Sequence, residues 1–157
     1  MQKRSEAAQQ ELEEAVTDLF EHKIVFNEYL GFRIRGRQAS NVAVEFDMRP
    51  ELVGHYMHGR LHGGVTSTVL DATGGLAVIW AIAELYAGES AMQILERFKA
   101  LATIDLRVDY LRPGLGSQFV AESNVVRLGR RIAATSSRLI SEEGKLIASA
   151  NATYIVS

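Results

Sequence analysis

The chain has 157 residues, a formal net charge of −2 and no cysteine. This length suits one domain with a full hydrophobic core, and the slightly acidic balance argues against a nucleic-acid-binding protein, which would normally be strongly basic. Without cysteine the chain has no disulfide, no thiolate zinc site and no cysteine nucleophile. We therefore expect a single domain over residues 1–157 and a cytoplasmic location.

The first part of the chain predicts a helix and then two strands. Residues 5 to about 25 carry apolar side chains at helical spacing with acidic side chains between them, which predicts an amphipathic N-terminal helix within residues 1–25. The same segment is charged and lacks the apolar centre of a signal peptide. Residues 32–38 and 42–48 alternate apolar and polar side chains, so we expect two strands with a turn at 39–41.

A long apolar helix is predicted at about residues 64–85, after a loop that contains Pro50, Gly54 and Gly59. Its length would allow it to span a membrane. However, it contains Asp71 and several threonines and glycines, so we expect a helix that is buried inside the protein.

A second helix is expected at about residues 89–101, with Met92, Leu95 and Phe98 along one side. The apolar side of this stretch would belong to the core or line a substrate pocket.

The last third of the chain predicts four strands. In the first strand, at residues 103–110, apolar side chains that would form the inner side alternate with polar ones. The apolar side chains are those of Ile104, Leu106, Val108 and Tyr110. The other three strands, at 117–128, 131–141 and 145–156, are joined by hairpin turns, which indicates antiparallel pairing. The expected fold class is α+β, with a curved antiparallel sheet of about six strands wrapped around the long helix.

The segment His62-Gly63-Gly64, followed by Asp71, is the strongest functional signal. Amides at a helix start lack partners within the helix and carry the positive end of its dipole, so they suit a developing oxyanion. A carboxylate in an apolar helix is costly unless it has partners or a task. Gly63 and Asp71 are about 12 Å apart along a helix. A site that uses both therefore needs a second chain, whose helix would lie antiparallel across a two-fold axis.

These residues, together with the strand Thr103–Pro113, resemble the hotdog-fold acyl-CoA thioesterases of the PaaI-like branch over roughly residues 25–156. The stretches 103–114 and 147–154 look most like the YigI-type medium- and long-chain acyl-CoA thioesterases. The resemblance implies a hotdog fold and an enzyme of fatty acid metabolism. Such an enzyme would hydrolyse medium- to long-chain acyl-CoA to a free fatty acid and CoA.

The resemblance also implies a role for each catalytic residue. The Gly63 N–H would bind the thioester oxygen, and His62 would orient that region. Asp71 of the neighbouring subunit would activate water as a general base, or attack directly to give a mixed anhydride. Thr103 matches the position of a Ser or Thr that helps to hold the water.

Further residues are predicted to contact the substrate. Gly64 adjoins the oxyanion site. Tyr56 stands six residues before His62, where PaaI-like enzymes often carry an asparagine as a second oxyanion donor. Arg112, Arg130 and Arg131 would contact the phosphates of CoA, or are solvated arginines in turns.

No cofactor and no metal is expected. His55, His58 and His62 would have a metal-binding spacing on a helix, but the glycines among them make that stretch a poor helix. The expected partners are acyl-CoA and further copies of the chain, as a dimer or a tetramer of two dimers, without nucleic acid or membrane. Two alternatives remain open: a non-catalytic acyl-CoA-binding hotdog protein, and an acyl-thioester dehydratase or hydratase.

Overall fold

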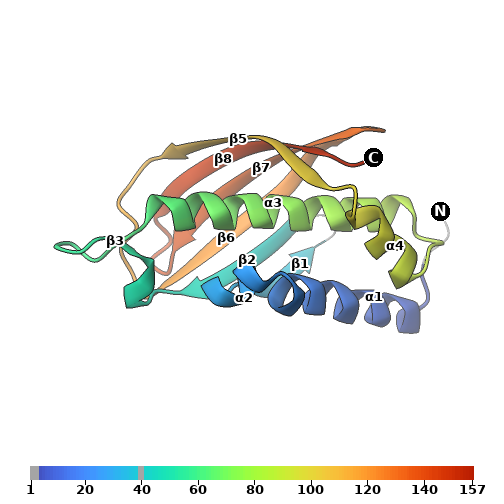
Figure 1. Ribbon diagram of the computed structural model, residues 1–157, viewed down its shortest axis with the longest axis horizontal. Helices are drawn as coiled ribbons and strands as arrows, with labels where there is room; N and C mark the ends of the chain where they lie inside the picture. The colour runs from blue at the N-terminus through green and yellow to red at the C-terminus, as the bar shows by residue number, and fades with distance from the viewer. Residues whose placement is uncertain (1–3, 39–40) are drawn as a thin grey trace.

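A six-stranded antiparallel sheet curves around one long helix, α3 (Gly63–Leu85), in the computed structural model of the chain, which describes residues 4–38 and 41–157 (Figure 1). The strand order is β1-β2-β6-β7-β8-β5. The strands are β1 (Arg33–Gln38), β2 (Asn41–Asp47), β5 (Ala102–Tyr110), β6 (Gln118–Leu128), β7 (Ile132–Ser141) and β8 (Leu146–Ile155). The predicted fold class is confirmed. Residues 39–40 of the predicted turn lie outside the described residues.

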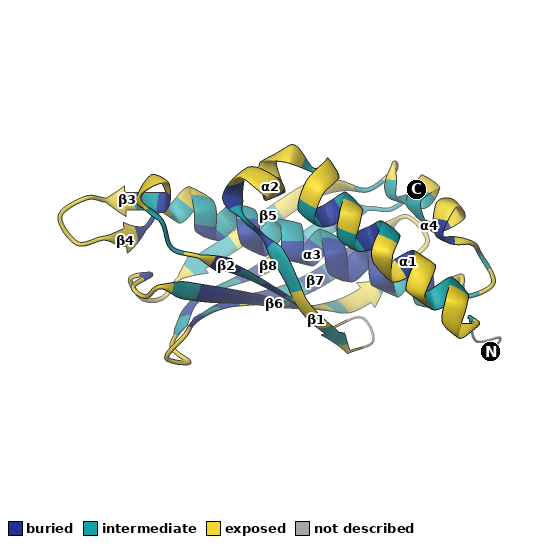
Figure 2. Cartoon of the chain, turned by 90° about the horizontal axis from the view of Figure 1, so that it is seen from below, coloured by how far each residue is buried: buried dark blue, intermediate teal, exposed yellow. Residues whose placement is uncertain are grey.

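Helix α3 forms the centre of the core, as predicted. Its buried side chains cover the whole circumference and include Val69, Leu76 and Ile82. A helix that is apolar on all sides must be enclosed. The sheet covers one side of α3 and the N-terminal helices cover the other (Figure 2). By length and composition alone α3 could cross a membrane, but its enclosure accounts for the apolar sequence.

The predicted N-terminal helix is broken into three pieces: α1 (Glu6–Asp18), a π-helical turn η1 (Leu19–Lys23) and α2 (Val25–Leu30). The predicted apolar side of this helix is confirmed, because Leu12, Val16 and Phe20 are buried in the core. Asn27 is also buried, and its Nδ2 donates to the Phe20 carbonyl oxygen at 3.0 Å. This side-chain bond stabilises the bend, because it satisfies a carbonyl close to the break in the helix.

Helix α4 (Ala91–Phe98) is shorter than predicted and rotated relative to the expectation. Ser90 and Gln93 form a capping box that fixes its start. Ala91 and Ile94 are buried, whereas Met92 is 74% exposed. The prediction that Met92 faces inward was therefore wrong, because the buried side of α4 begins one residue earlier.

The segment before α3 contains a short 3-10 turn, η2 (Pro50–Leu52), and a protruding hairpin of β3 (Val53–His55) and β4 (Arg60–Leu61) (Figure 1). Two backbone hydrogen bonds tie the end of this hairpin to the body: the His62 N–H donates to Leu52 and the Leu61 N–H donates to Gly114, each at 2.8 Å. These bonds fix the point at which α3 begins.

A β-bulge changes the alternation at the start of β5. Thr103 pairs with Tyr154 of β8 and Asp105 pairs with Thr153, so Ile104 is an extra residue in the ladder. Ile104 is consequently 55% exposed, and its predicted place on the inner side was wrong. Leu106 remains packed against the core. The bulge puts Thr103 on the same side of the strand as Leu106, toward α3.

Candidate active site

Asp71 lies two turns after the start of α3. Hydroxyl groups from β5 and β8 contact it there. The Thr103 Oγ1 donates to Asp71 Oδ1 at 2.9 Å. The Tyr154 hydroxyl lies 2.8 Å from the Asp71 carbonyl oxygen and 3.2 Å from Oδ1. Both hydroxyl contacts of the carboxylate are thus made by Oδ1. Among the described residues, Oδ2 is left without a hydrogen-bond partner.

Asp71 also lines a cavity of about 420 Å³ between α3, the N-terminal helices, the end of α4 and strands β5 and β8. Its polar end holds Ser67, Thr68, Asp71 and Thr103. The remainder is mainly apolar and is lined by Leu19, Phe20, Ile24, Phe26, Ala72, Leu76, Ile79, Phe98, Leu101 and Leu106. Of the cavity-lining residues in the described chain, only Asp71 and Tyr154 are ionisable.

The cavity follows one side of α3 away from Asp71. Ala72, Gly75, Leu76 and Ile79 recur at helical spacing along it. The eight residues from Asp71 to Ile79 correspond to about 12 Å of helix. Of the three residues of the 89–101 stretch that were predicted to belong to the core or line a pocket, Phe98 lines the cavity, Leu95 packs against the core and Met92 is exposed. The π-helical turn η1 forms part of the wall and was not foreseen.

Tyr154 stays protonated beside this carboxylate. Burial raises the pKa of the Tyr154 phenol, and the negative charge of Asp71 raises it further. The phenol is therefore a hydrogen-bond donor to Asp71 and is not a competing base. Sequence reasoning did not identify Tyr154, since no spacing in the sequence relates it to Asp71.

The start of α3 forms a second polar group. The Gly64 N–H donates to His62 Nδ1 at 2.8 Å, and the N–H groups of Val65 and Thr66 donate to the His62 carbonyl oxygen. His62 is thus the N-cap of the helix, and Nδ1 carries a lone pair rather than a proton. Of the first four amides of α3, the Gly63 N–H alone has no acceptor within residues 4–38 and 41–157.

A tyrosine of β5 holds the same helix start in place. The Tyr110 hydroxyl donates to the Gly63 carbonyl oxygen at 2.8 Å. Tyr110 was predicted only as a strand residue, and its contact with Gly63 is a finding of the structure. The geometry leaves the Gly63 N–H, at the positive end of the α3 dipole, available to an anionic oxygen.

The structure brings the predicted catalytic residues together in two groups. Asp71 and Thr103 form one group, and His62, Gly63 and Gly64 form the other. Because α3 is continuous from Gly63 to Leu85, the two groups are separated by about 12 Å within one chain. The expectation that they meet across two chains stays a prediction.

The predicted substrate contacts are all exposed. Tyr56 lies between β3 and β4 and is 87% exposed. The Arg112 guanidinium donates to the Leu146 carbonyl oxygen at the start of β8, whereas Arg130 and Arg131 lie in the β6–β7 turn beside the end of β8. The length of β8 is about 30 Å. Arg112 and the arginine pair of one chain are therefore too far apart to bind the same phosphate.

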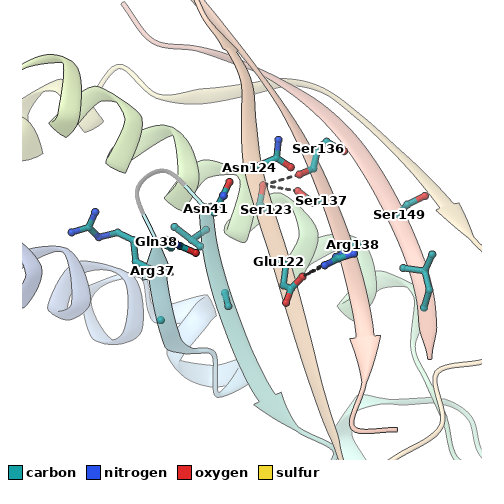
Figure 3. Close-up of a pocket in the computed structure, with 14 residues that line it drawn as sticks. Arg37, Gln38, Asn41, Glu122, Ser123, Asn124, Ser136, Ser137, Arg138 and Ser149 are labelled. Carbon is teal, nitrogen blue, oxygen red and sulfur yellow. Dashed lines mark hydrogen bonds and ion pairs between the residues drawn. The ribbon is translucent and has the colours of Figure 1, made fainter. Parts of the chain in front are cut away.

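A larger depression of about 940 Å³ lies across β1, β2, β6, β7 and β8 (Figure 3). Its side chains are mainly neutral and polar, and its Glu122 and Arg138 form an ion pair at 2.7 Å. It contains none of the predicted site residues. The candidate site is therefore the smaller cavity at Asp71. No cluster of three or more His, Asp or Glu side chains that could hold a metal ion occurs in the described part of the chain.

Comparisons with known proteins agree with this architecture. A family model described as "Thioesterase superfamily" matches residues 58–148. The chain is 36% identical over 141 residues to the medium/long-chain acyl-CoA thioesterase YigI of Escherichia coli, which covers 90% of this chain and 91% of that protein. A solved structure from Shewanella oneidensis, related to the thioesterase superfamily, superposes with a TM-score of 0.89 at 35% identity, covering 98% of this chain and 99% of that one. A thioesterase family protein from Silicibacter pomeroyi superposes with a TM-score of 0.70 at 25% identity, covering 92% and 96%.

Proposed function

The chain belongs to the thioesterase superfamily, and we propose that it hydrolyses medium- to long-chain acyl-CoA to a free fatty acid and CoA. The observation that carries this proposal is the cavity at Asp71, which joins one carboxylate to a long apolar pocket. An apolar acyl chain gains about 0.8 kcal/mol for each methylene that it buries. The pocket therefore favours acyl groups that are long enough to fill it, which agrees with the YigI enzymes that this chain resembles.

The pocket length gives a measure of the preferred acyl group. A fully extended alkyl chain advances about 1.25 Å per carbon, from bond lengths near 1.5 Å and angles near 111°. The stretch of α3 from Asp71 to Ile79, about 12 Å, then accommodates roughly nine or ten carbons. We propose that acyl groups of about this length fill the cavity.

The active unit is a homodimer in this proposal, built by pairing of β5 with β5 of a second copy. β5 is an edge strand of nine residues, and it exposes Ile104. Antiparallel pairing of two such edges extends one sheet through both chains. The same β5 carries Thr103, bonded to Asp71, near one end and Tyr110, bonded to Gly63, at the other. A two-fold axis near the middle of the strand exchanges these ends and brings the partner's Gly63 toward Asp71.

The proposed reaction uses the two polar groups in turn. The partner's Gly63 N–H binds the thioester oxygen and stabilises the negative charge that develops on it. Asp71 Oδ2 takes a proton from water as the water attacks the carbonyl carbon, or attacks that carbon itself to give a mixed anhydride that water then hydrolyses. In both routes the carbon–sulfur bond breaks, CoA leaves as the thiolate and the products are the fatty acid and CoA.

The test is the release of free thiol from a panel of acyl-CoA substrates by wild type and by Asp71→Asn. The substitution keeps the shape of the side chain and removes the base, so we expect kcat to fall by roughly 10²- to 10⁴-fold. Asp47→Asn is the matched control, because Asp47 pairs with Arg33 at the end of β2 and lies outside the cavity. The control should retain wild-type activity.

The remaining outcomes discriminate the alternatives. Turnover that is unchanged in Asp71→Asn would remove Asp71 from its role. Tight binding of acyl-CoA without turnover in either protein would favour the acyl-CoA-binding protein.

We propose a soluble cytoplasmic enzyme, since the one long apolar helix among the described residues is enclosed by the fold.

A further inference from the structure

Helix α3 contains two adjacent glycines, Gly74 and Gly75, directly after the turn that carries Asp71. Each glycine in a helix interior costs about 1 kcal/mol relative to alanine. Such a cost calls for a structural reason at the position concerned. At Gly74 the reason is a close approach by β8, because a Cβ built there would overlap the Tyr154 hydroxyl oxygen and lie 3.1 Å from Tyr154 Cζ.

The absence of a side chain at position 74 thus allows the Tyr154 hydroxyl to reach the helix backbone. There the hydroxyl lies within hydrogen-bonding distance of two oxygens of Asp71, the carbonyl oxygen and Oδ1. Tyr154 itself is only 2% exposed, so its ring is held by the core. The hydroxyl has a fixed position relative to the carboxylate.

Thr103 approaches the same carboxylate oxygen from the neighbouring strand. Thr103 and Tyr154 are directly paired residues of β5 and β8, and the bulge at Ile104 is what turns Thr103 toward α3. Two strand residues therefore converge on Oδ1. The single phenolic proton of Tyr154 is shared between the Asp71 carbonyl oxygen at 2.8 Å and Oδ1 at 3.2 Å, and with the Thr103 hydroxyl it restricts rotation of the carboxylate about χ2.

We propose that Tyr154 is a positioning residue which, with Thr103, fixes Asp71 Oδ1 and directs Oδ2 at the reacting water or thioester carbon, with Gly74 as the position that admits the tyrosine. This inference rests on the proposed thioesterase function. Tyr154 acts through Asp71 and exchanges no proton with the substrate.

The first experiment measures kcat and KM for acyl-CoA hydrolysis by Tyr154→Phe. We expect kcat to fall about tenfold, which is the scale of one hydrogen bond to a charged group. KM should change little, because phenylalanine keeps the ring that lines the cavity.

Thr73→Val is the matched control. Thr73 is fully buried in the same helix, and its hydroxyl donates to the Val69 carbonyl oxygen, away from the cavity. Removal of this hydroxyl costs one buried hydrogen bond without touching Asp71. The control should keep the wild-type kcat and KM, even if both variants lose a similar amount of thermal stability.

A second pair of variants separates positioning from folding. Gly74→Ala places a methyl group against the Tyr154 hydroxyl, so it should lower both stability and kcat although it removes no group from the site. The double variant Gly74→Ala/Tyr154→Phe removes the overlapping oxygen and leaves the tighter-than-usual contacts of the methyl group with the ring Cζ at 3.1 Å and with Thr135 Oγ1 at 3.0 Å. It should recover part of the stability that Gly74→Ala loses, measured by thermal unfolding, while kcat stays at the Tyr154→Phe level.

Combination with Asp71→Asn supplies the decisive readout. If Tyr154 acts through Asp71, then Tyr154→Phe causes no further loss of kcat in the Asp71→Asn background. An equal loss in both backgrounds, or a Tyr154→Phe variant that matches Thr73→Val in kcat, would overturn the inference. Failure of the proposed function has a different signature, because neither wild type nor Asp71→Asn would then release thiol from acyl-CoA.

Discussion

The side chain at position 75 is expected to set the longest acyl group that the cavity accepts. Gly75 lies midway along the cavity, four residues or about 6 Å beyond Asp71. A Cβ at this position would lie 3.6 Å from Leu101 Cδ2 and 3.9 Å from Tyr154 Cε1, which are ordinary contact distances to two residues of the cavity wall. A larger side chain here should fit the backbone and block the far half of the pocket.

The size of the effect follows from the length that is lost. Gly75→Leu leaves about 6 Å of pocket, or roughly five carbons, in place of the nine or ten of wild type. Four methylenes that can no longer be buried cost about 3 kcal/mol. The ratio of kcat/KM for decanoyl-CoA to that for hexanoyl-CoA should therefore fall roughly 200-fold. Activity on hexanoyl-CoA should stay close to wild type, since Asp71 and Thr103 are untouched.

Gly75→Ala is the graded control for this substitution. One added methyl removes the room for about one methylene, so the same ratio should fall about fourfold. The helix should gain about 1 kcal/mol of unfolding free energy from the higher propensity of alanine. The values of kcat and KM are measured in a continuous free-thiol assay with acyl-CoA substrates of different chain length. A chain-length profile of Gly75→Leu that matched wild type would refute the assignment of the cavity to the acyl chain.

Three other substitutions test the helix start, the proposed dimer and an ion pair. His62→Ala removes the side-chain acceptor of the Gly64 N–H, so it should lower the unfolding free energy by about 1 kcal/mol in urea titration and slow thiol release. Unchanged stability would show that the cap does not stabilise the helix. Ile104→Lys puts a charge on the exposed edge β5 and should shift the proposed dimer toward monomer in light scattering, with activity falling in parallel. The hydrogen bond from Arg97 holds the pKa of Glu89 below its usual 4.5. Glu89→Gln should therefore lower the unfolding free energy at neutral pH. The difference in unfolding free energy from wild type should disappear as the pH falls through the lowered pKa. A difference that did not diminish on acidification would contradict this assignment.

The order and type of the main elements were predictable because their signals are local. The apolar run that forms α3 and the tight turns of the last third of the chain are sequence features that need no knowledge of the fold. Asp71 and Thr103 were both predicted as catalytic residues from the resemblance to known thioesterases, but the hydrogen bond between them was not predicted. Its cause could not be anticipated, since strict alternation with Leu106 points Thr103 away from α3.

The bulge at Ile104 explains this difference. A bulge is decided by the register between β5 and β8, which are 36 residues or more apart in the chain, and not by the side chains of β5 alone. The same holds for Tyr154, whose role depends on which helix residue its strand passes. The break at η1 and the rotated face of α4 likewise depend on packing, through buried Asn27 and Ala91. Contacts between strands and helices far apart in the chain thus decided the orientation of Thr103 and the position of Tyr154.

The two adjacent glycines of α3 lower the helix propensity of the segment that carries the candidate site. They are one residue apart and so project about 100° from each other around the helix. Gly74 faces the Tyr154 hydroxyl, and Gly75 faces the cavity. Propensity alone would favour alanine at both positions by similar amounts. The structure predicts opposite results, because alanine at 75 meets only ordinary contacts and should stabilise the fold, whereas alanine at 74 overlaps a buried hydroxyl and should destabilise it. If both positions instead gained stability on substitution, Tyr154 would not lie against the helix at Gly74, and the fixed orientation of Asp71 would lose its physical basis.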